Sequence, residues 1–160
     1  MSAHLFRTSL AAALLAAAAW ATPPAPAPAR TPITHDKLWM MQRVGTPQVS
    51  PDGKWVVFSV LEPAYDQDQE VSDLWLVPAD GSAPPRRLTH TKAPEKGVDW
   101  SPDSHRLAFA TKREGDELEQ IYILDLADGG EARRLTNVST GASNPRWRPD
   151  GQALLFESSV

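Results

Sequence analysis

Serine hydrolysis needs an exposed nucleophile, a neighbouring base and donors for the oxyanion, and the sequence offers one near match to the usual motif. Gly141-Ala142-Ser143-Asn144-Pro145 has the first glycine and the serine of a Gly-x-Ser-x-Gly elbow but lacks the final glycine. Ser143 also stands just before a strand of the repeat described below, so we interpret it as a loop residue. The sequence therefore predicts no catalytic residue in this chain.

Metal binding has no better support. The four histidines, His4, His35, His90 and His105, lack metal-ligand spacing, and the chain contains no cysteine. The stretch Asp66-Gln67-Asp68-Gln69-Glu70 alternates oxygen ligands, but it lacks the central glycine and the distant glutamate of a calcium loop. We predict solvated loop residues at His35, His90, His105 and the acidic stretch, with no metal and no cofactor, while His4 would be removed with the export signal described below.

Two double arginines, Arg86-Arg87 and Arg133-Arg134, have the appearance of a basic patch. There is no phosphate loop or dinucleotide fingerprint beside them. Because the pairs recur at one position of a repeat, we expect them to pair with acids of neighbouring units rather than to bind phosphate. The net charge of −4, from 16 Lys and Arg against 20 Asp and Glu, does not favour nucleic acid as a partner.

The N-terminus has the pattern of an export signal. Residues 1–7 form a short positive head, residues 9–19 are apolar and uncharged, and Ala19-Trp20-Ala21 has the small-x-small pattern that a signal peptidase accepts. The apolar run is too short for the ~30 Å bilayer core, which needs about 20 residues. We predict a signal peptide over residues 1–21, cleavage between Ala21 and Thr22, and a periplasmic or secreted mature chain without a membrane anchor.

A spacer and a short helix follow. Residues 22–33 are rich in proline and alanine, which excludes a helix and favours an extended tether. Thr34 is a suitable N-cap, and Asp36 would lie near the positive end of a helix that begins there. The pattern predicts a helix through Arg43, so that residues 34–45 form a short helix and a lead-in.

A repeat that begins near residue 46 determines the expected fold. The same proline-initiated turn recurs 51 and 47 residues apart, at residues 51–53, 102–104 and 149–151. Five residues after each proline stands an apolar side chain, and two residues later a phenylalanine. These positions are Val56 and Phe58, Leu107 and Phe109, and Leu154 and Phe156. The two-residue spacing places both side chains on one face of a strand.

A second block repeats at an offset of 47 residues. Residues 74–77 align with residues 121–124, and Arg-Arg-Leu-Thr occurs identically at 86–89 and 133–136. The longer first interval is explained by a longer loop around residues 62–72. This loop carries the acidic stretch, which gives that stretch a second interpretation as a contact for a positive ligand group at a propeller mouth.

Each unit holds four short strand candidates, and the units start near residues 46, 97 and 144. Four strands in a period of about 40 to 50 residues are typical of a β-propeller. We therefore predict an all-β fold over residues 46–160: an incomplete propeller of four-stranded antiparallel blades, with two full blades and part of a third. The alternative is an open antiparallel sheet or sandwich in which the similarity is accidental.

The repeat resembles a known type. Trp100-Ser101-Pro102-Asp103, Ile-Tyr-Ile-Leu-Asp-Leu at residues 121–126 and the Arg-Arg-Leu-Thr blocks resemble TolB-like or WD-repeat-like propeller repeats over residues 46–160. Ser104, in place of glycine, and Arg148, in place of serine, are minor departures.

A narrower resemblance lies at the start of the repeat region. Residues 38–44 and 47–53 are similar to the start of bacterial serine peptidases of the prolyl oligopeptidase family, in the acylaminoacyl- and dipeptidyl-peptidase-like branch. The resemblance implies a propeller that restricts access to short peptides and covers a C-terminal α/β-hydrolase domain with a Ser-Asp-His triad. No triad residue can be carried over to this chain, so we expect the gene to continue past Val160 into further repeats and the catalytic domain.

Two other classes fit the same repeats. One is a TolB-like periplasmic propeller that binds protein partners without catalysis. The other is a propeller fused to a metal-dependent amidohydrolase, which would show histidine clusters downstream. Fold-level analogy alone does not separate these three classes.

Overall fold

The computed structural model describes residues 31–66, 70–127 and 131–159. The predicted signal peptide, nearly all of the spacer and the centre of the acidic stretch lie outside these residues. Ile33–Val160 form one unit by their internal contacts. Within the described residues, no helix has the length and apolar character needed to cross a bilayer.

Helix α1 (His35–Trp39) begins where it was predicted but ends earlier. The Thr34 side chain accepts a hydrogen bond from the Lys37 backbone N–H at 3.3 Å, as an N-cap does. The predicted extension through Arg43 is wrong, because β1 (Arg43–Val44) pairs with a strand of the first blade instead. A strand of two residues forms because a partner strand lies beside it, and two residues are too few to show a sequence pattern that would predict it.

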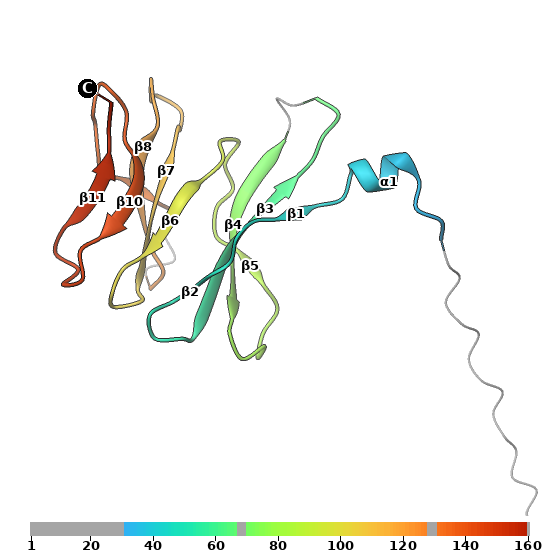
Figure 1. The fold of residues 1–160 in the computed structure, drawn as a ribbon, viewed down its shortest axis with the longest axis horizontal. Coiled ribbons are helices and arrows are strands. Elements are labelled where there is room, and N and C mark those ends of the chain that lie inside the picture. The colour runs from blue at the N-terminus through green and yellow to red at the C-terminus, as the bar shows by residue number, and fades with distance from the viewer. Residues whose placement is uncertain (1–30, 67–69, 128–130, 160) are drawn as a thin grey trace, which may run out of the picture. The chain divides into compact units, whose positions relative to one another are not determined.

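Blade 1 contains β1, β2 (Gln48–Val49), β3 (Trp55–Glu62), β4 (Val71–Pro78) and β5 (Arg86–Arg87). Both β1 and β2 pair with β3, so together they occupy the first strand position of the blade, with a break between them. Strands β3 and β4 are antiparallel over their whole length (Figure 1).

Blade 2 repeats this arrangement in the order β6-β7-β8-β9. Its strands are β6 (Lys96–Trp100), β7 (Arg106–Thr111), β8 (Gln120–Asp125) and β9 (Arg133–Arg134). Blade 3 has a two-stranded sheet, β10 (Ser143–Trp147) and β11 (Leu154–Glu157). The predicted all-β partial propeller, with two full blades and part of a third, is confirmed.

The proline-initiated turn is held by the serine that precedes it. In blade 2, Ser101 Oγ donates to Asp103 Oδ1 at 2.5 Å and accepts from the Arg106 backbone N–H at 2.8 Å. Residue 104 has a φ of 63°, where glycine is usual. Its hydroxyl accepts a hydrogen bond from the Asp52 backbone N–H at 3.1 Å. The departure from glycine at Ser104 therefore links blade 2 to blade 1.

The blades stack on each other through alternate faces of their strands. Between blades 1 and 2 the core contains Val57, Leu74 and Leu76 from blade 1, with Trp100, Leu107, Phe109, Tyr122 and Leu124 from blade 2. Between blades 2 and 3 it contains Ala110, Ile121 and Ala142, with Leu154 and Phe156 packed against them. Neighbouring side chains of β7 thus serve opposite interfaces, as the two-residue period of a strand requires.

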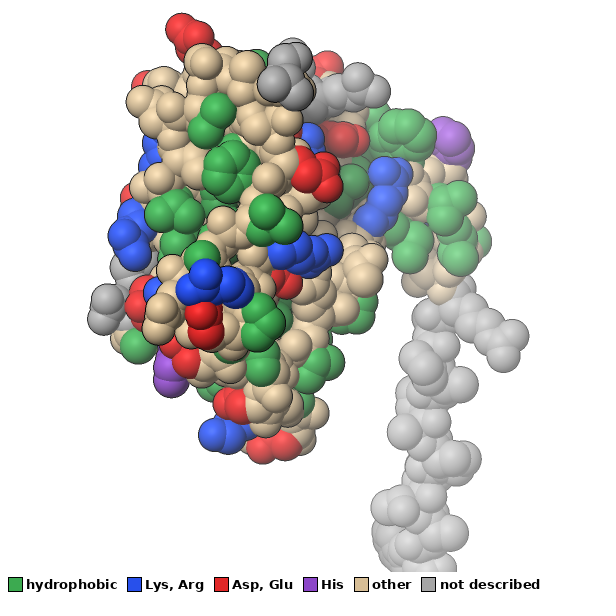
Figure 2. All heavy atoms as spheres, turned by 60° about the vertical axis from the view of Figure 1, so that its left-hand side comes forward, with side chains coloured by type: hydrophobic (Ala, Val, Ile, Leu, Met, Phe, Trp, Pro, Cys, Tyr) green, Lys and Arg blue, Asp and Glu red, His purple; other side chains and the backbone are tan. Residues whose placement is uncertain are grey.

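Polar contacts reinforce both interfaces. Trp100 Nε1 donates to the Gln48 carbonyl at 3.3 Å across the first. Across the second, Asp99 accepts from Arg146 Nη1 at 3.1 Å and from the Trp147 backbone N–H at 2.7 Å. Figure 2 brings the blade 3 side forward and shows hydrophobic side chains at the surface among charged ones. Leu155 of β11 is 74% exposed, so this partial blade is not covered on all sides.

Candidate functional site

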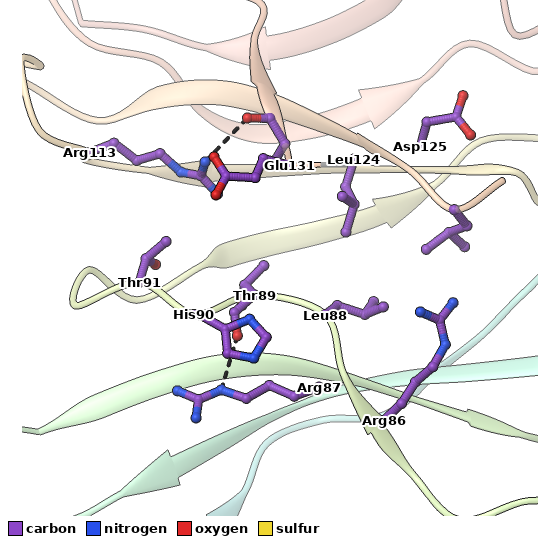
Figure 3. Close-up of a pocket in the computed structure, with 12 residues that line it drawn as sticks. Arg86, Arg87, Leu88, Thr89, His90, Thr91, Arg113, Leu124, Asp125 and Glu131 are labelled. Carbon is purple, nitrogen blue, oxygen red and sulfur yellow. Dashed lines mark hydrogen bonds between the residues drawn. The ribbon is translucent and has the colours of Figure 1, made fainter. Parts of the chain in front are cut away.

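The cavity drawn in Figure 3 lies between blades 1 and 2 and has a volume of about 310 Å³. Residues 86–91, which comprise β5 and the connection after it, form one wall. Residues 124–126 and 131–132 lie on the other wall, together with Arg113. The lining carries both signs of charge, from Arg86, Arg87, Arg113, Asp125 and Glu131.

Two of the arginines of this cavity have structural partners. Arg87 Nε donates to the Thr89 carbonyl at 3.0 Å, and its guanidinium pairs with the buried Asp73. Arg113 Nη1 donates to the Ala132 carbonyl at 3.2 Å, and its guanidinium lies 4.7 Å from the centre of the Tyr122 ring. Figure 3 shows both backbone contacts on opposite walls. Arg87 and Arg113 thus each brace their own wall of the cavity, and Arg113 Nε is buried without a hydrogen-bond partner.

A buried carboxylate ties β4 to the connection that leads into blade 2. Asp73 is almost fully buried and accepts from Thr89 Oγ1 at 3.2 Å and from the Thr91 backbone N–H at 3.1 Å, in addition to Arg87. Thr89 Oγ1 in turn accepts from the Leu74 backbone N–H at 2.9 Å. A charged group with this many donors is well compensated for burial.

The same position of blade 2 is neutral. Gln120 replaces Asp73, and its Oε1 accepts from Thr136 Oγ1 at 2.8 Å and from the Val138 backbone N–H at 3.0 Å. Gln120 Nε2 completes the set by donating to the Val138 carbonyl at 2.8 Å. The same hydrogen-bond network therefore occurs in both blades, with a carboxylate at its centre in blade 1 and an amide in blade 2.

Blade 2 has its own buried acid in the β7–β8 loop. Asp116 accepts from Arg134 Nη1 at 2.9 Å, from Tyr122 Oη at 2.7 Å and from the Arg113 backbone N–H at 3.0 Å. Burial raises the pKa of the Tyr122 phenol, and the hydrogen bond to the Asp116 carboxylate raises this pKa further.

Of the three buried acids among the described residues, Asp73, Glu95 and Asp116, Glu95 has the fewest hydrogen-bond partners. It is 6% exposed and lies just before β6, where its Oε1 accepts from Thr91 Oγ1 at 2.9 Å while Oε2 has no hydrogen-bond partner. Burial raises its pKa to about 7, and the nearby Asp73 contributes to the rise, whereas hydrogen bonds from the Thr91 and Thr89 hydroxyls and from its own backbone N–H oppose it. Between blades 2 and 3 the corresponding residue is Ala142, 47 positions later.

The residues first considered for catalysis and metal binding are scattered. The interpretation of Ser143 as a loop residue is wrong, because Ser143 is the first residue of β10, where it pairs with Glu157. No described histidine side chain is hydrogen-bonded to it. His35 begins α1, His90 follows β5 and His105 lies in a turn, so the three lie in different elements. Among the described residues, no group of three or more His, Asp or Glu side chains could hold a metal ion.

The arginine pairs were predicted to contact acids of neighbouring blades, and this is wrong. Arg87 pairs with Asp73 and Arg134 with Asp116, each within its own blade. The reason is local: the strand that carries each arginine runs beside the strand or loop that carries its acid. Of the acidic stretch, residues 67–69 lie outside the described residues, so its role at a mouth is not tested.

Sequence reasoning missed Asp73, Glu95 and Asp116. Two of the three differ from their counterparts in the repeat, Gln120 and Ala142, and this difference could have identified them. Within the described residues, the arrangement offers no paired nucleophile and base. The cavity between blades 1 and 2 is instead lined by charged side chains of both signs, which suits it to a structural role.

Comparisons with known proteins agree with this fold. The model of the TolB beta propeller domain matches residues 39–160. The chain is 36% identical over 102 residues to "Uncharacterized peptidase YuxL" of Bacillus subtilis, covering 62% of this chain and 15% of that protein. It is 30% identical over 107 residues to "Dipeptidyl-peptidase 5" of Porphyromonas gingivalis, covering 67% of this chain and 16% of that one. The chain thus spans about one sixth of the length of these curated relatives.

Solved structures show the same architecture. Acylaminoacyl peptidase of Pyrococcus horikoshii matches with a TM-score of 0.58 and 14% identity, over 74% of this chain and 17% of that one. TolB of Acinetobacter baumannii matches with a TM-score of 0.52 and 24% identity, over 73% of this chain and 27% of that one. At these identities the matches concern the fold alone. With a family model that covers residues 39–160, and with two full blades and part of a third in the structure, this chain belongs to the TolB beta propeller domain family.

Proposed function

We propose that this chain is the N-terminal part of the propeller of an exported serine peptidase of the prolyl oligopeptidase family. In this proposal a catalytic α/β-hydrolase domain follows in the same polypeptide, and the propeller admits short peptides to it. The supporting observation is that the curated relatives are named as peptidases, while the match to them covers a propeller segment and about one sixth of their length.

The structure is consistent with a role in access rather than in chemistry. Arg134 and Asp116 of blade 2 are paired with each other, and Asp116 also accepts from the Arg113 backbone N–H. A blade braced in this way suits a wall that excludes large substrates. The α/β-hydrolase domain and the peptide substrates are the partners that this proposal requires.

The proposal predicts that the full-length protein hydrolyses dipeptide and acyl-peptide chromogenic substrates, whereas residues 22–160 alone hydrolyse none above background. The reason is that an activated nucleophile needs a hydrogen-bonded base, which the described residues do not provide. The measurement is the initial rate on each substrate at equal molar protein. Replacement of the serine of any downstream Gly-x-Ser-x-Gly motif is the control.

Two outcomes would contradict it. A full-length protein that binds protein partners but cleaves no peptide would favour the non-catalytic TolB-like alternative. Activity that residues 22–160 retain after purification, and that Ser143→Ala abolishes, would place the chemistry in this chain.

Export is the second part of the proposal. In a secreting bacterial host we expect a mature protein that begins at Thr22, because Ala19-Trp20-Ala21 fits a signal peptidase site. Intact-mass spectrometry of the periplasmic or secreted fraction measures this directly, with Ala21→Gln as a variant whose cleavage should be impaired. A soluble cytoplasmic product that retains Met1 would refute export.

A further inference from the structure

The connection between blades 1 and 2 contains an acid with no positive partner. Glu95 lies between Thr91 and the first residue of β6, and it lines a small cavity of about 180 Å³ with residues of β2, β3, β4 and β6. Of the described residues that line this cavity, Glu95 is the one with a formal charge. A carboxylate in such surroundings is costly unless something neutralises it.

The charged groups around Glu95 do not supply this neutralisation. On β4, Asp73 is negative and buried, and on β5 the Arg87 guanidinium is already paired with Asp73. On β6, Lys96 Nζ extends to Glu119 Oε1 at 2.5 Å. In the connection itself, Lys92 is exposed. An ionised Glu95 would therefore place a second negative charge beside Asp73.

The number of hydrogen-bond donors beside Glu95 indicates whether the site favours its protonated or its ionised carboxyl group. Thr91 Oγ1 lies 2.9 Å from both Glu95 Oε1 and the Ala93 carbonyl, but a hydroxyl has one hydrogen to donate. If Glu95 is ionised, Thr91 can donate to only one of the two acceptors. The carboxylate then relies on its own backbone N–H and on the Thr89 hydroxyl, which also contacts Asp73 Oδ1 at 3.2 Å. If Glu95 carries a proton on Oε1, this O–H donates to Thr91 Oγ1 and the threonine donates to the Ala93 carbonyl. Both contacts are then satisfied.

A proton also fits the space better than a larger cation. Glu95 Oε2 is buried and without a partner, and the described residues around it form no cluster that could coordinate a metal ion. We propose that Glu95 is a proton-binding site at the joint of blades 1 and 2, which holds the joint closed as a neutral acid and loosens it when the proton is released to solvent. This inference concerns the propeller itself and does not depend on the proposed peptidase activity.

The direction of the pH effect follows from linkage. The pKa of Glu95 is raised to about 7 from the ordinary 4.5, so the folded chain binds more protons than the unfolded chain between these values. The contribution to stability is fully present below pH 4.5 and is lost as the pH rises to about 7. The joint between blades 2 and 3 has Ala142 at this position and should show no such dependence.

The test compares the full-length wild type with Glu95→Gln and Glu95→Ala. The amide introduced by Glu95→Gln would be able to donate to Thr91 Oγ1 as the neutral acid does, and alanine is the residue of the next unit. From pH 5 to pH 8 we expect the folding equilibrium constant of the wild type to fall on the order of 50-fold, and much less in both variants. Glu117→Gln, which removes an exposed acid of the β7–β8 loop, is the matched control and should keep the wild-type pH dependence.

Two measurements locate the effect. After correction for intrinsic rates, amide hydrogen exchange at residues 89–96 should accelerate from pH 5 to pH 8, whereas exchange at the equivalent residues 136–143 should not. Carbon-13 NMR of glutamate carboxyls in the wild type should show one titration near pH 7 that is lost in Glu95→Ala. If every glutamate titrates below about pH 5.5, or if Glu95→Gln keeps the wild-type pH dependence, the proposal is wrong.

Discussion

Phe109→Ala is expected to destabilise residues 22–160 by about 3–5 kcal/mol, the usual cost of removing a fully buried phenylalanine side chain. Phe109 is 0% exposed and belongs to the core between blades 1 and 2. Its ring also stacks on that of Tyr122, with centroids 6.5 Å apart. The loss should appear as a lower urea midpoint, monitored by tryptophan fluorescence. Because the core contains side chains of both blades, both should unfold at this lower midpoint.

Phe58→Ala is the matched control, since Phe58 occupies the same position of the first repeat. It pairs across the strands with Trp75, as Phe109 pairs with Tyr122, but it is only half-buried. Within the described residues no blade packs on that face of blade 1. We expect Phe58→Ala to cost about 1–2 kcal/mol, because less apolar area returns to water. Equal losses for the two variants would contradict this stacking of the blades.

These two residues show how far the sequence predicts the fold. The phenylalanines at 58, 109 and 156 correctly indicated three equivalent strands and the face that each side chain occupies. Their burial could not be read from the pattern, because burial depends on whether another blade lies opposite. The two-residue pattern of apolar residues predicts a strand and its faces, whereas the exposure of each side chain depends on which elements pack against that strand.

The register shifts in the first strands of blades 2 and 3 could not be predicted from the sequence for a similar reason. The first strands of blades 2 and 3 carry register shifts at the same place, where Gly97 and Asn144 have φ values of 59° and 49°. A Cβ at residue 97 would lie 3.3 Å from Asn144 Cα, so the glycine allows two neighbouring strands to approach. Glycine and asparagine tolerate this conformation, but neither residue type by itself indicates a bulge.

The candidate site was predicted less well than the fold. Motif reasoning directed attention to isolated residues such as Ser143 and His90. The informative acids, Asp73 and Glu95, were visible only as departures from Gln120 and Ala142 in the repeat. A residue that differs from its counterpart in the repeat marks a position of interest. Whether that residue is ionised depends on its burial and on the hydrogen-bond donors that the fold places beside it.

Asp116→Ala is the second substitution with a large expected effect, at about 2–4 kcal/mol, because each buried donor left unpaired costs about 1–3 kcal/mol. The Asp116 side chain is 1% exposed, and its removal would leave the Tyr122 hydroxyl and the Arg113 backbone N–H without their acceptor. The Arg134 side chain is about one third exposed and can turn to water, so its loss adds less. Urea unfolding at pH 7 gives the change in free energy.

A second readout separates this loss of partners from simple loss of volume. In the wild type the raised pKa of Tyr122 means that its stabilising contribution is present below pH 10 and is lost as the pH rises through the folded value. Without the Asp116 carboxylate the pKa of Tyr122 should fall, which ultraviolet titration of tyrosinate detects. Glu117→Ala, an exposed neighbour in the same loop, should change stability by less than about 0.5 kcal/mol. An Asp116→Ala variant as stable as Glu117→Ala would show that the loop is not held by this carboxylate, and that Tyr122 and Arg113 find water or other acceptors when it is removed.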